Sequence, residues 1–193
     1  MLAGRAAALR AAARPLQRER IPVESKARLL GHPIHQMLVV FPLGLLGTSV
    51  IFDLLAHGMN EPLMAVVAYY LIVAGVVAGL VAAPFGTIDW LAIPRGTRAK
   101  SVGALHAGGN VVVLLLFAGS AWMRHEAPAA PSVLAQVLSF GATGLALVTA
   151  WLGGELVDRL GVGISDGANL NAPSSLSHRD SHGRPLAAER PGR

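Results

Sequence analysis

Four long apolar runs alternate with short polar segments along the chain. The runs cover about residues 36–56, 63–83, 103–123 and 133–153. Because an α-helix rises about 1.5 Å per residue, about 20 apolar residues are enough to cross the hydrocarbon core of a bilayer. The pattern therefore predicts an all-α integral membrane protein, in which short connections make successive helices antiparallel neighbours in a four-helix bundle.

Prolines and glycines mark the expected breaks in these helices. Pro33 can occupy a first helical turn, where no backbone donor is lost, whereas Pro42 lies inside the first run and should kink it. Pro84 and Gly86 are expected to end the second helix. The polar segment after them carries Trp90 beside basic residues, a combination typical of a membrane interface.

The second run contains Gly75 and Gly79, spaced as in the GxxxG motif. Glycines at this spacing let a neighbouring helix approach closely. The motif is common in apolar sequence, and its specificity is modest. We expect both glycines to be helix-packing residues.

Composition supports a membrane protein and narrows its chemistry. The chain has 193 residues, of which 53% are hydrophobic and 14% charged, with a mean hydropathy of +0.52. A soluble domain has a larger charged fraction. The chain has no cysteine, which excludes disulfides, thiolate nucleophiles and cysteine-ligated iron–sulfur or zinc sites. Any metal must then be held by His, Asp, Glu or Met.

The regions on either side of the four runs are polar. Residues 1–30 are rich in alanine and arginine, and three arginines would share one face of a helix there: Arg10, Arg14 and Arg18. An interfacial amphipathic helix or a flexible segment is favoured over a transit peptide. Residues 165–193 lack periodicity and predict a disordered tail. The four-span domain is therefore expected at residues 31–164.

The distribution of charge predicts the orientation. Of the 16 Lys and Arg residues, Arg124 alone lies on the side of the bundle that holds the first and third connections. By the positive-inside rule, both termini are cytoplasmic. The net charge of +5 does not indicate nucleic-acid binding, because the basic residues flank apolar runs and no RNA-reading motif accompanies them.

This topology brings several candidate ligands to one membrane face. His32 and His35 begin the first helix, Asp89 follows the second, His106 lies about one turn into the third, and Glu155 ends the fourth. Ionisable side chains in a membrane bundle usually face its interior or a cavity. Neutral imidazole is a good ligand for haem iron, copper or zinc.

Two interpretations of this cluster stay open. In the first, His35 and His106 are the axial ligands of a haem b, or belong to a metal site completed by the other cluster members, and Gly108 and Gly109 leave room for a flat macrocycle. In the second, His35 caps a helix, His106 bonds a carbonyl or a carboxylate, and the glycines serve packing. A transmembrane proton path is disfavoured, because the middle of each run is almost without ionisable groups.

A second polar group lies at the other end of the bundle. Asp53 and His57 are four residues apart and share a helical face, with Glu61 beyond them. Along a helix Asp53 is about 27 Å from His35, which is too far for a shared site. We expect an ion pair between Asp53 and His57 at the outer face, or hydration of this helix end.

The residues also resemble a known family. The segments GHPIHQMLVVFPLGLL, FDLL, GTIDWLAIPRGTRAK with the following His106, and WLGGELVDRLGVGI are similar, in sequence and order, to the predicted bacterial membrane proteins grouped as domain of unknown function 2231. The resemblance runs from about Gly31 to Ile164. It implies a four-span helical domain with the five cluster residues at motif positions. Gln36 departs from the family pattern, which more often has proline there.

Known relatives of this domain occur fused to Rieske-type iron–sulfur domains, so the resemblance implies an electron-transfer setting. This chain would need such a partner in trans. No hydrolase, transferase or nucleotide-binding motif is present. The leading hypothesis is a redox or metal-binding module of the bacterial inner membrane, not an enzyme by itself. The alternative is a structural or assembly subunit that holds a partner subunit, lipid or a second copy through GxxxG and the basic N-terminal segment.

Overall fold

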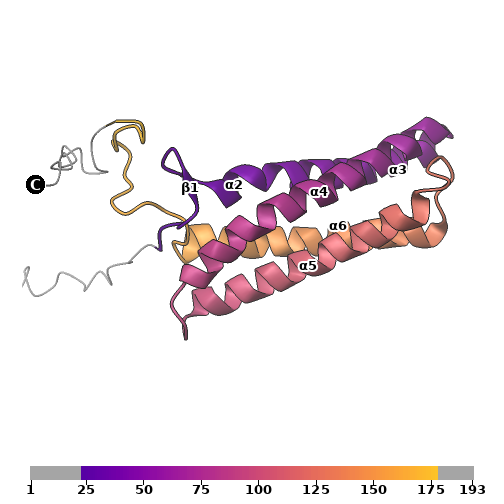
Figure 1. The fold of residues 1–193 in the computed structure, drawn as a ribbon. Helices are drawn as coiled ribbons and strands as arrows, with labels where there is room; N and C mark the ends of the chain where they lie inside the picture. The colour runs from indigo at the N-terminus through magenta and orange to yellow at the C-terminus, as the bar shows by residue number, and fades with distance from the viewer. Residues whose placement is uncertain (1–22, 178–193) are drawn as a thin grey trace, which may run out of the picture.

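The computed structural model describes residues 23–177. Four long helices lie side by side: α3 (Val40–Met59), α4 (Pro62–Ala92), α5 (Arg98–Arg124) and α6 (Val133–Gly154) (Figure 1). The short helix α2 (Ile34–Leu38) precedes α3, and the π-helical turn η1 (Glu155–Arg159) follows α6. Two short strands, β1 (Arg28–Leu29) and β2 (His32–Pro33), form an antiparallel hairpin before α2. The predicted all-α four-helix architecture is confirmed.

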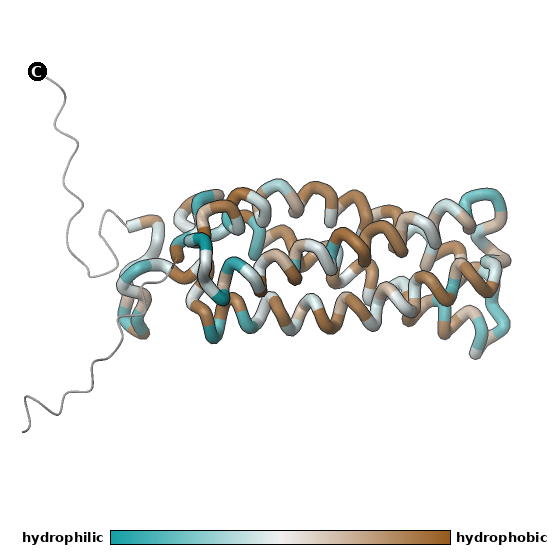
Figure 2. Tube along the Cα trace, turned by 90° about the horizontal axis from the view of Figure 1, so that it is seen from below, coloured by the Kyte–Doolittle hydropathy of each residue, from teal (hydrophilic) through white to brown (hydrophobic). Residues whose placement is uncertain are grey.

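The bundle has the polarity of a membrane-spanning domain. All four helical segments are long and apolar enough to cross a membrane. Figure 2 shows polar residues collected at both ends of the bundle, with apolar residues prevailing between them. The α4–α5 connection and both ends of the described chain lie at one end, which we call the histidine end (Figure 1). The α3–α4 and α5–α6 connections lie at the other, the arginine end.

Each long helix packs on two neighbours. Helix α4 lies against α3 and α5, and α6 lies against α5 and α3, so α3 and α5 face each other diagonally across the bundle. A small buried core lies between the helices: Leu46, Ile72, Val113, Phe117 and Ala142. Most large apolar side chains point outward instead, as expected of helices surrounded by lipid rather than water.

The first span is interrupted near Pro42, as the sequence predicts. Helix α2 ends at Leu38, Val39 lies in a turn, and α3 begins at Val40. Pro42 has no amide hydrogen to donate to the carbonyl of Leu38, so the helix breaks about one turn before it. This break sets the direction of α2, which carries His35.

The second span is longer than predicted, and the expectation that Pro84 and Gly86 end it is wrong. Helix α4 continues through both residues to Ala92. A proline removes one backbone hydrogen bond, and a long membrane helix packed among others tolerates that loss. Asp89 and Trp90 therefore lie in the last turns of α4 rather than in a loop.

The chain segments that flank the four spans meet at the histidine end. The N–H of Val23 donates to the carbonyl of Gly161 (3.2 Å), and the N–H of Gly163 donates to the carbonyl of Val23 (2.8 Å). Arg28 donates to the hydroxyl of Ser165 at 2.7 Å. The predicted basic helical face of residues 1–22 and the last part of the predicted tail, residues 178–193, lie outside the described residues.

Gly75 and Gly79 lie where side chains from neighbouring helices approach α4 most closely. A Cβ atom on Gly75 would lie 2.6 Å from Cδ2 of Leu46 in α3, and one on Gly79 would lie 2.6 Å from Cδ2 of Leu114 in α5. Both glycines are buried. Their missing side chains let α4 contact two helices at once.

We expect the substitution Gly75→Ala to lower the free energy of unfolding by about 1–3 kcal/mol, because the new methyl group overpacks against Leu46. Gly144→Ala is the matched control, since no neighbouring atom lies within 4 Å of a Cβ at that position in α6. Thermal unfolding of the two variants in the same detergent makes the comparison. Equal melting temperatures would contradict the assigned packing role.

Candidate functional site

His35 is held by helix α4. Its Nδ1 lies 3.1 Å from the carbonyl oxygen of Ala82. A carbonyl oxygen only accepts, so Nδ1 carries the hydrogen, and in the neutral imidazole the lone pair is then on Nε2. One turn further along α4, Gly86 makes room for the ring, since a Cβ there would lie 2.7 Å from Cε1 of His35. The tautomer and the position of the imidazole are thus both set by α4.

His106 is held by α6 in the same way. Its Nδ1 lies 2.8 Å from the carbonyl oxygen of Thr149, and one turn further a Cβ on Gly153 would lie 3.1 Å from Cε1 of the ring. The side chain of Asn110 donates to the carbonyl of His106 (2.9 Å) and lies 3.2 Å from its Nε2. The hydroxyl of Thr149 donates to Oδ1 of Asn110 at 2.9 Å. His106 therefore also presents Nε2 as an acceptor.

The two histidines lie at the same end of the bundle, on diagonal helical segments. Helix α2 continues into α3, which lies diagonal to α5, and both rings lie at the histidine end. The carbonyl bond of His106 matches the second interpretation of the sequence. It is equally compatible with the first, because ligand histidines usually donate their other ring N–H to such a group.

Asp89, the first of the other three cluster residues, secures the chain before β1. It accepts hydrogen bonds from the hydroxyl of Ser25 (2.8 Å), from the backbone N–H of Lys26 (2.7 Å) and from that of Ala27 (3.2 Å). This carboxylate is surrounded by donors from one short segment. Its position fixes that segment over the end of α4.

The remaining members have separate partners. Glu155 forms an ion pair with Arg98 at 2.6 Å, and His32 lies 3.3 Å from the hydroxyl of Ser175. Across residues 23–177, no group of three or more His, Asp or Glu side chains is placed to hold a metal ion. His35 and His106 differ from the other three members in that each ring is bonded to a backbone carbonyl of a neighbouring helix.

Of the two glycines beside His106, Gly109 matches the packing role of the second interpretation. Gly108 is exposed, with no neighbouring atom within 4 Å of a Cβ built there. At Gly109 a Cβ would lie 2.5 Å from Cγ2 of Thr149, so this glycine serves the packing of α5 on α6. The glycines that adjoin the imidazoles are Gly86 and Gly153, on the neighbouring helices.

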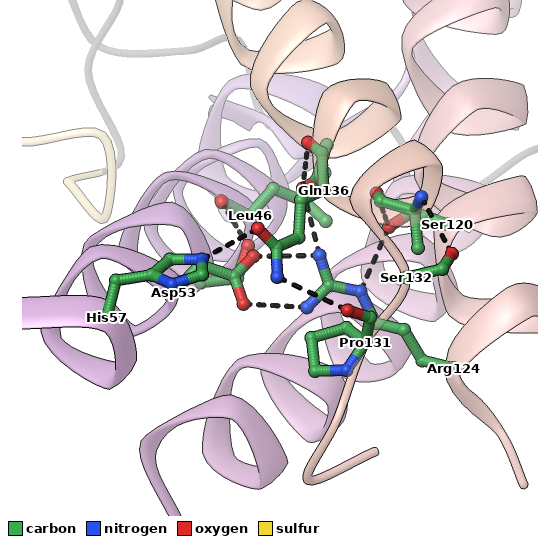
Figure 3. Close-up of polar contacts among 11 residues, drawn as sticks. Leu46, Asp53, His57, Ser120, Arg124, Pro131, Ser132 and Gln136 are labelled. Carbon is green, nitrogen blue, oxygen red and sulfur yellow. Dashed lines mark hydrogen bonds and ion pairs between the residues drawn. The ribbon is translucent and has the colours of Figure 1, made fainter. Parts of the chain in front are cut away.

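The arginine end contains a buried ion pair that the sequence reading missed. Arg124 and Asp53 are 0% and 1% exposed, and two parallel hydrogen bonds of 2.7 and 2.8 Å join the guanidinium to the carboxylate (Figure 3). The guanidinium also donates to the hydroxyls of Ser120 (3.1 Å) and Ser139 (3.0 Å). This network joins α3, α5 and α6.

The expected pairing of Asp53 with His57, or its hydration, is therefore corrected. His57 is exposed and donates to Oε1 of Gln136 at 2.7 Å, while Glu61 caps α4 by accepting from the N–H of Leu63. Arg124 is the last residue of α5 rather than a loop residue. A lone arginine directly after an apolar run, across from a lone aspartate, was the signal for this pair.

Comparison with known proteins agrees with this architecture. A family model described as predicted membrane protein (DUF2231) matches residues 31–166, which include the four spans and both histidines. No similar protein was found among curated proteins or among solved structures. The chain therefore belongs to the DUF2231 family of predicted membrane proteins.

Proposed function

We propose that this protein is a membrane-embedded electron-transfer module in which His35 and His106 are the two axial ligands of a haem b. The observation that carries the proposal is the matched state of the two imidazoles. Each donates Nδ1–H to a backbone carbonyl of the neighbouring helix and keeps Nε2 as an acceptor. A histidine that ligates a metal through Nε2 usually donates its other ring N–H to such a group.

The number of donors favours haem over a bare metal ion. A zinc ion is usually bound by three or four protein side chains, whereas the macrocycle of haem supplies the equatorial ligands and needs only axial ones from the protein. Two histidines, with the nearest carboxylates engaged by Ser25 and Arg98, match the smaller requirement. Glycines beside both rings, Gly86 and Gly153, keep bulk away from them.

The chain's own residues would define the properties of the site. The carbonyls of Ala82 and Thr149 fix the orientation of the two rings and increase the basicity of Nε2. Asn110 would give up its contact with Nε2 of His106 and retain its bond to the carbonyl of the same residue. When bound, haem supplies a one-electron iron couple. His35 and His106 would hold the haem, whose role would then be electron transfer rather than the binding of a substrate.

We expect protein purified in detergent from haem-supplemented cells to have the absorption spectrum of six-coordinate, low-spin haem at one haem per chain. His35→Ala and His106→Ala should each remove the low-spin spectrum, because each deletes one axial ligand. Added imidazole should restore it in both variants. Optical and electron paramagnetic resonance spectra measure the outcome.

His32→Ala is the matched control, because His32 lies three residues before His35, is exposed and contacts Ser175. It should leave the spectrum unchanged. If the purified protein contained stoichiometric zinc or copper and showed no Soret band, the cofactor would be a bare metal ion and not haem. A folded protein with neither haem nor metal would overturn the proposal.

We also propose that the protein lies in the bacterial inner membrane with the histidine end in the cytoplasm. The support is the charge distribution, since Arg124 is the one Lys or Arg residue at the arginine end among residues 23–177, and it is neutralised by Asp53. The redox partner would be a membrane-complex subunit with its own electron carrier. It would then approach the histidine end from the cytoplasmic side of the membrane.

Orientation can be measured by cysteine labelling, because the chain has no cysteine of its own. Ala129→Cys introduces a thiol in the exposed α5–α6 connection, and Pro94→Cys introduces one in the exposed α4–α5 connection without removing a charge. In intact cells, a membrane-impermeant maleimide should label the first variant, and the second only after permeabilisation. The reverse pattern would place the termini outside the cytoplasm.

A further inference from the structure

The first and third spans carry their polar residues at the same spacing. His35 is followed by Asp53 after 18 positions, and His106 is followed by Arg124 after 18 positions. Adding 71 to a residue number in the first span therefore gives its counterpart in the third. The two histidines are counterparts, and the two members of the buried ion pair are counterparts of each other.

Three of the four buried residues of α3 have buried counterparts in α5, Asp53 among them. Ser49 corresponds to Ser120, and both serines are 0% exposed. Leu46 corresponds to Phe117, and both belong to the central core cluster. The correspondence thus extends from the ends of the spans to the positions that pack between them.

The second and fourth spans correspond with a shift of 67. The four buried residues of α6 are Ala135, Ser139, Ala142 and Thr149. Subtracting 67 gives four residues that are all buried in α4: Ala68, Ile72, Gly75 and Ala82. The groups that hold the two imidazoles are also counterparts, since the same shift relates Ala82 to Thr149 and Gly86 to Gly153.

The arrangement in space has the matching symmetry. Exchanging α3 with α5 and α4 with α6 reproduces the same set of neighbouring helices. We propose that the domain consists of two copies of one two-helix unit, residues 34–92 and 98–159, related by a local two-fold axis along the bundle. We further propose that the Asp53–Arg124 pair makes each unit bind the other rather than a copy of itself.

The reason is the position of the pair. Asp53 and Arg124 occupy equivalent places on diagonal helices and meet at the axis, where both are almost fully buried. Two copies of the first unit would place two aspartates there, and two copies of the second would place two arginines. Buried like charges have no compensation in a low-dielectric interior. The opposite charges of the unlike units instead form two short hydrogen bonds.

Charge reversal in the full-length protein reproduces these combinations. Asp53→Arg creates the arginine–arginine combination and Arg124→Asp creates the aspartate–aspartate one. We expect each to lower the apparent melting temperature in detergent by about 10 °C or more, because a buried charge loses its partner. The exchange D53R/R124D should recover most of this loss, since Ser49 stands where Ser120 supports the guanidinium.

The symmetry also predicts that the D53R/R124D variant lacks one hydrogen-bond acceptor for the new guanidinium. Ile72 occupies the counterpart position of Ser139. Its side chain has no atom that could accept a hydrogen bond from a guanidinium on α3, as Ser139 does from Arg124. Adding I72S and S139I to the exchange should therefore raise the melting temperature further. In the native charge arrangement, the same two substitutions should lower it, because Arg124 then loses its contact with Ser139.

The pair of Arg98 and Glu155, whose side chains are 61% and 18% exposed, supplies the control, because the exchange R98E/E155R should change the melting temperature by no more than about 2 °C. If the single reversals leave no folded protein, the yield of folded protein is compared instead. The inference then predicts that D53R/R124D gives a higher yield than either single variant. Single variants as stable as the wild type, or an exchange no better than the single variants, would overturn the inference. None of these measurements depends on a bound cofactor.

Discussion

The buried ion pair between Arg124 and Asp53 is the constraint on which the bundle depends. Apolar helices gain little from facing each other rather than lipid, so shape and polar contacts define how they are placed. The pair joins α3 to α5 across the bundle, with Ser120 and Ser139 each accepting one further hydrogen bond from the guanidinium. Sliding one helix along the other would separate two charges inside a dry interior, where each lost partner costs about 3–5 kcal/mol.

This constraint at one end determines the geometry at the other. His35 and His106 are each 18 residues before a member of the pair, a distance of about 27 Å along a helix. Fixing the heights of Asp53 and Arg124 therefore brings the two imidazoles to similar depths. The carbonyls of Ala82 and Thr149 then set their orientation. Each half of the chain supplies one of the two histidines and one member of the ion pair, so neither half forms the arrangement alone.

The sequence was sufficient for the four helices, because long apolar runs have one stable form in a membrane. It was also sufficient to bring His35 and His106 to one end, since topology alone places the starts of the first and third spans together. It failed for the end of α4, because the local rule that proline ends a helix is weaker than the packing of a long span. It did not predict the partners of Asp89 or Glu155, which depend on how the connecting segments fold back.

Arg124 was missed for a different reason. A charge at the edge of an apolar run looks like a loop residue, and burial depends on which helix lies diagonally opposite. The equal spacing of His35 to Asp53 and His106 to Arg124 was visible in the sequence, but the intervening apolar residues interchange freely and conceal the repeat. Once the halves are aligned, the histidines are seen to occupy equivalent places in two units. A ligand bound by both histidines would stabilise only the bundle in which the two units are associated. It would act at the histidine end, as the ion pair acts at the arginine end.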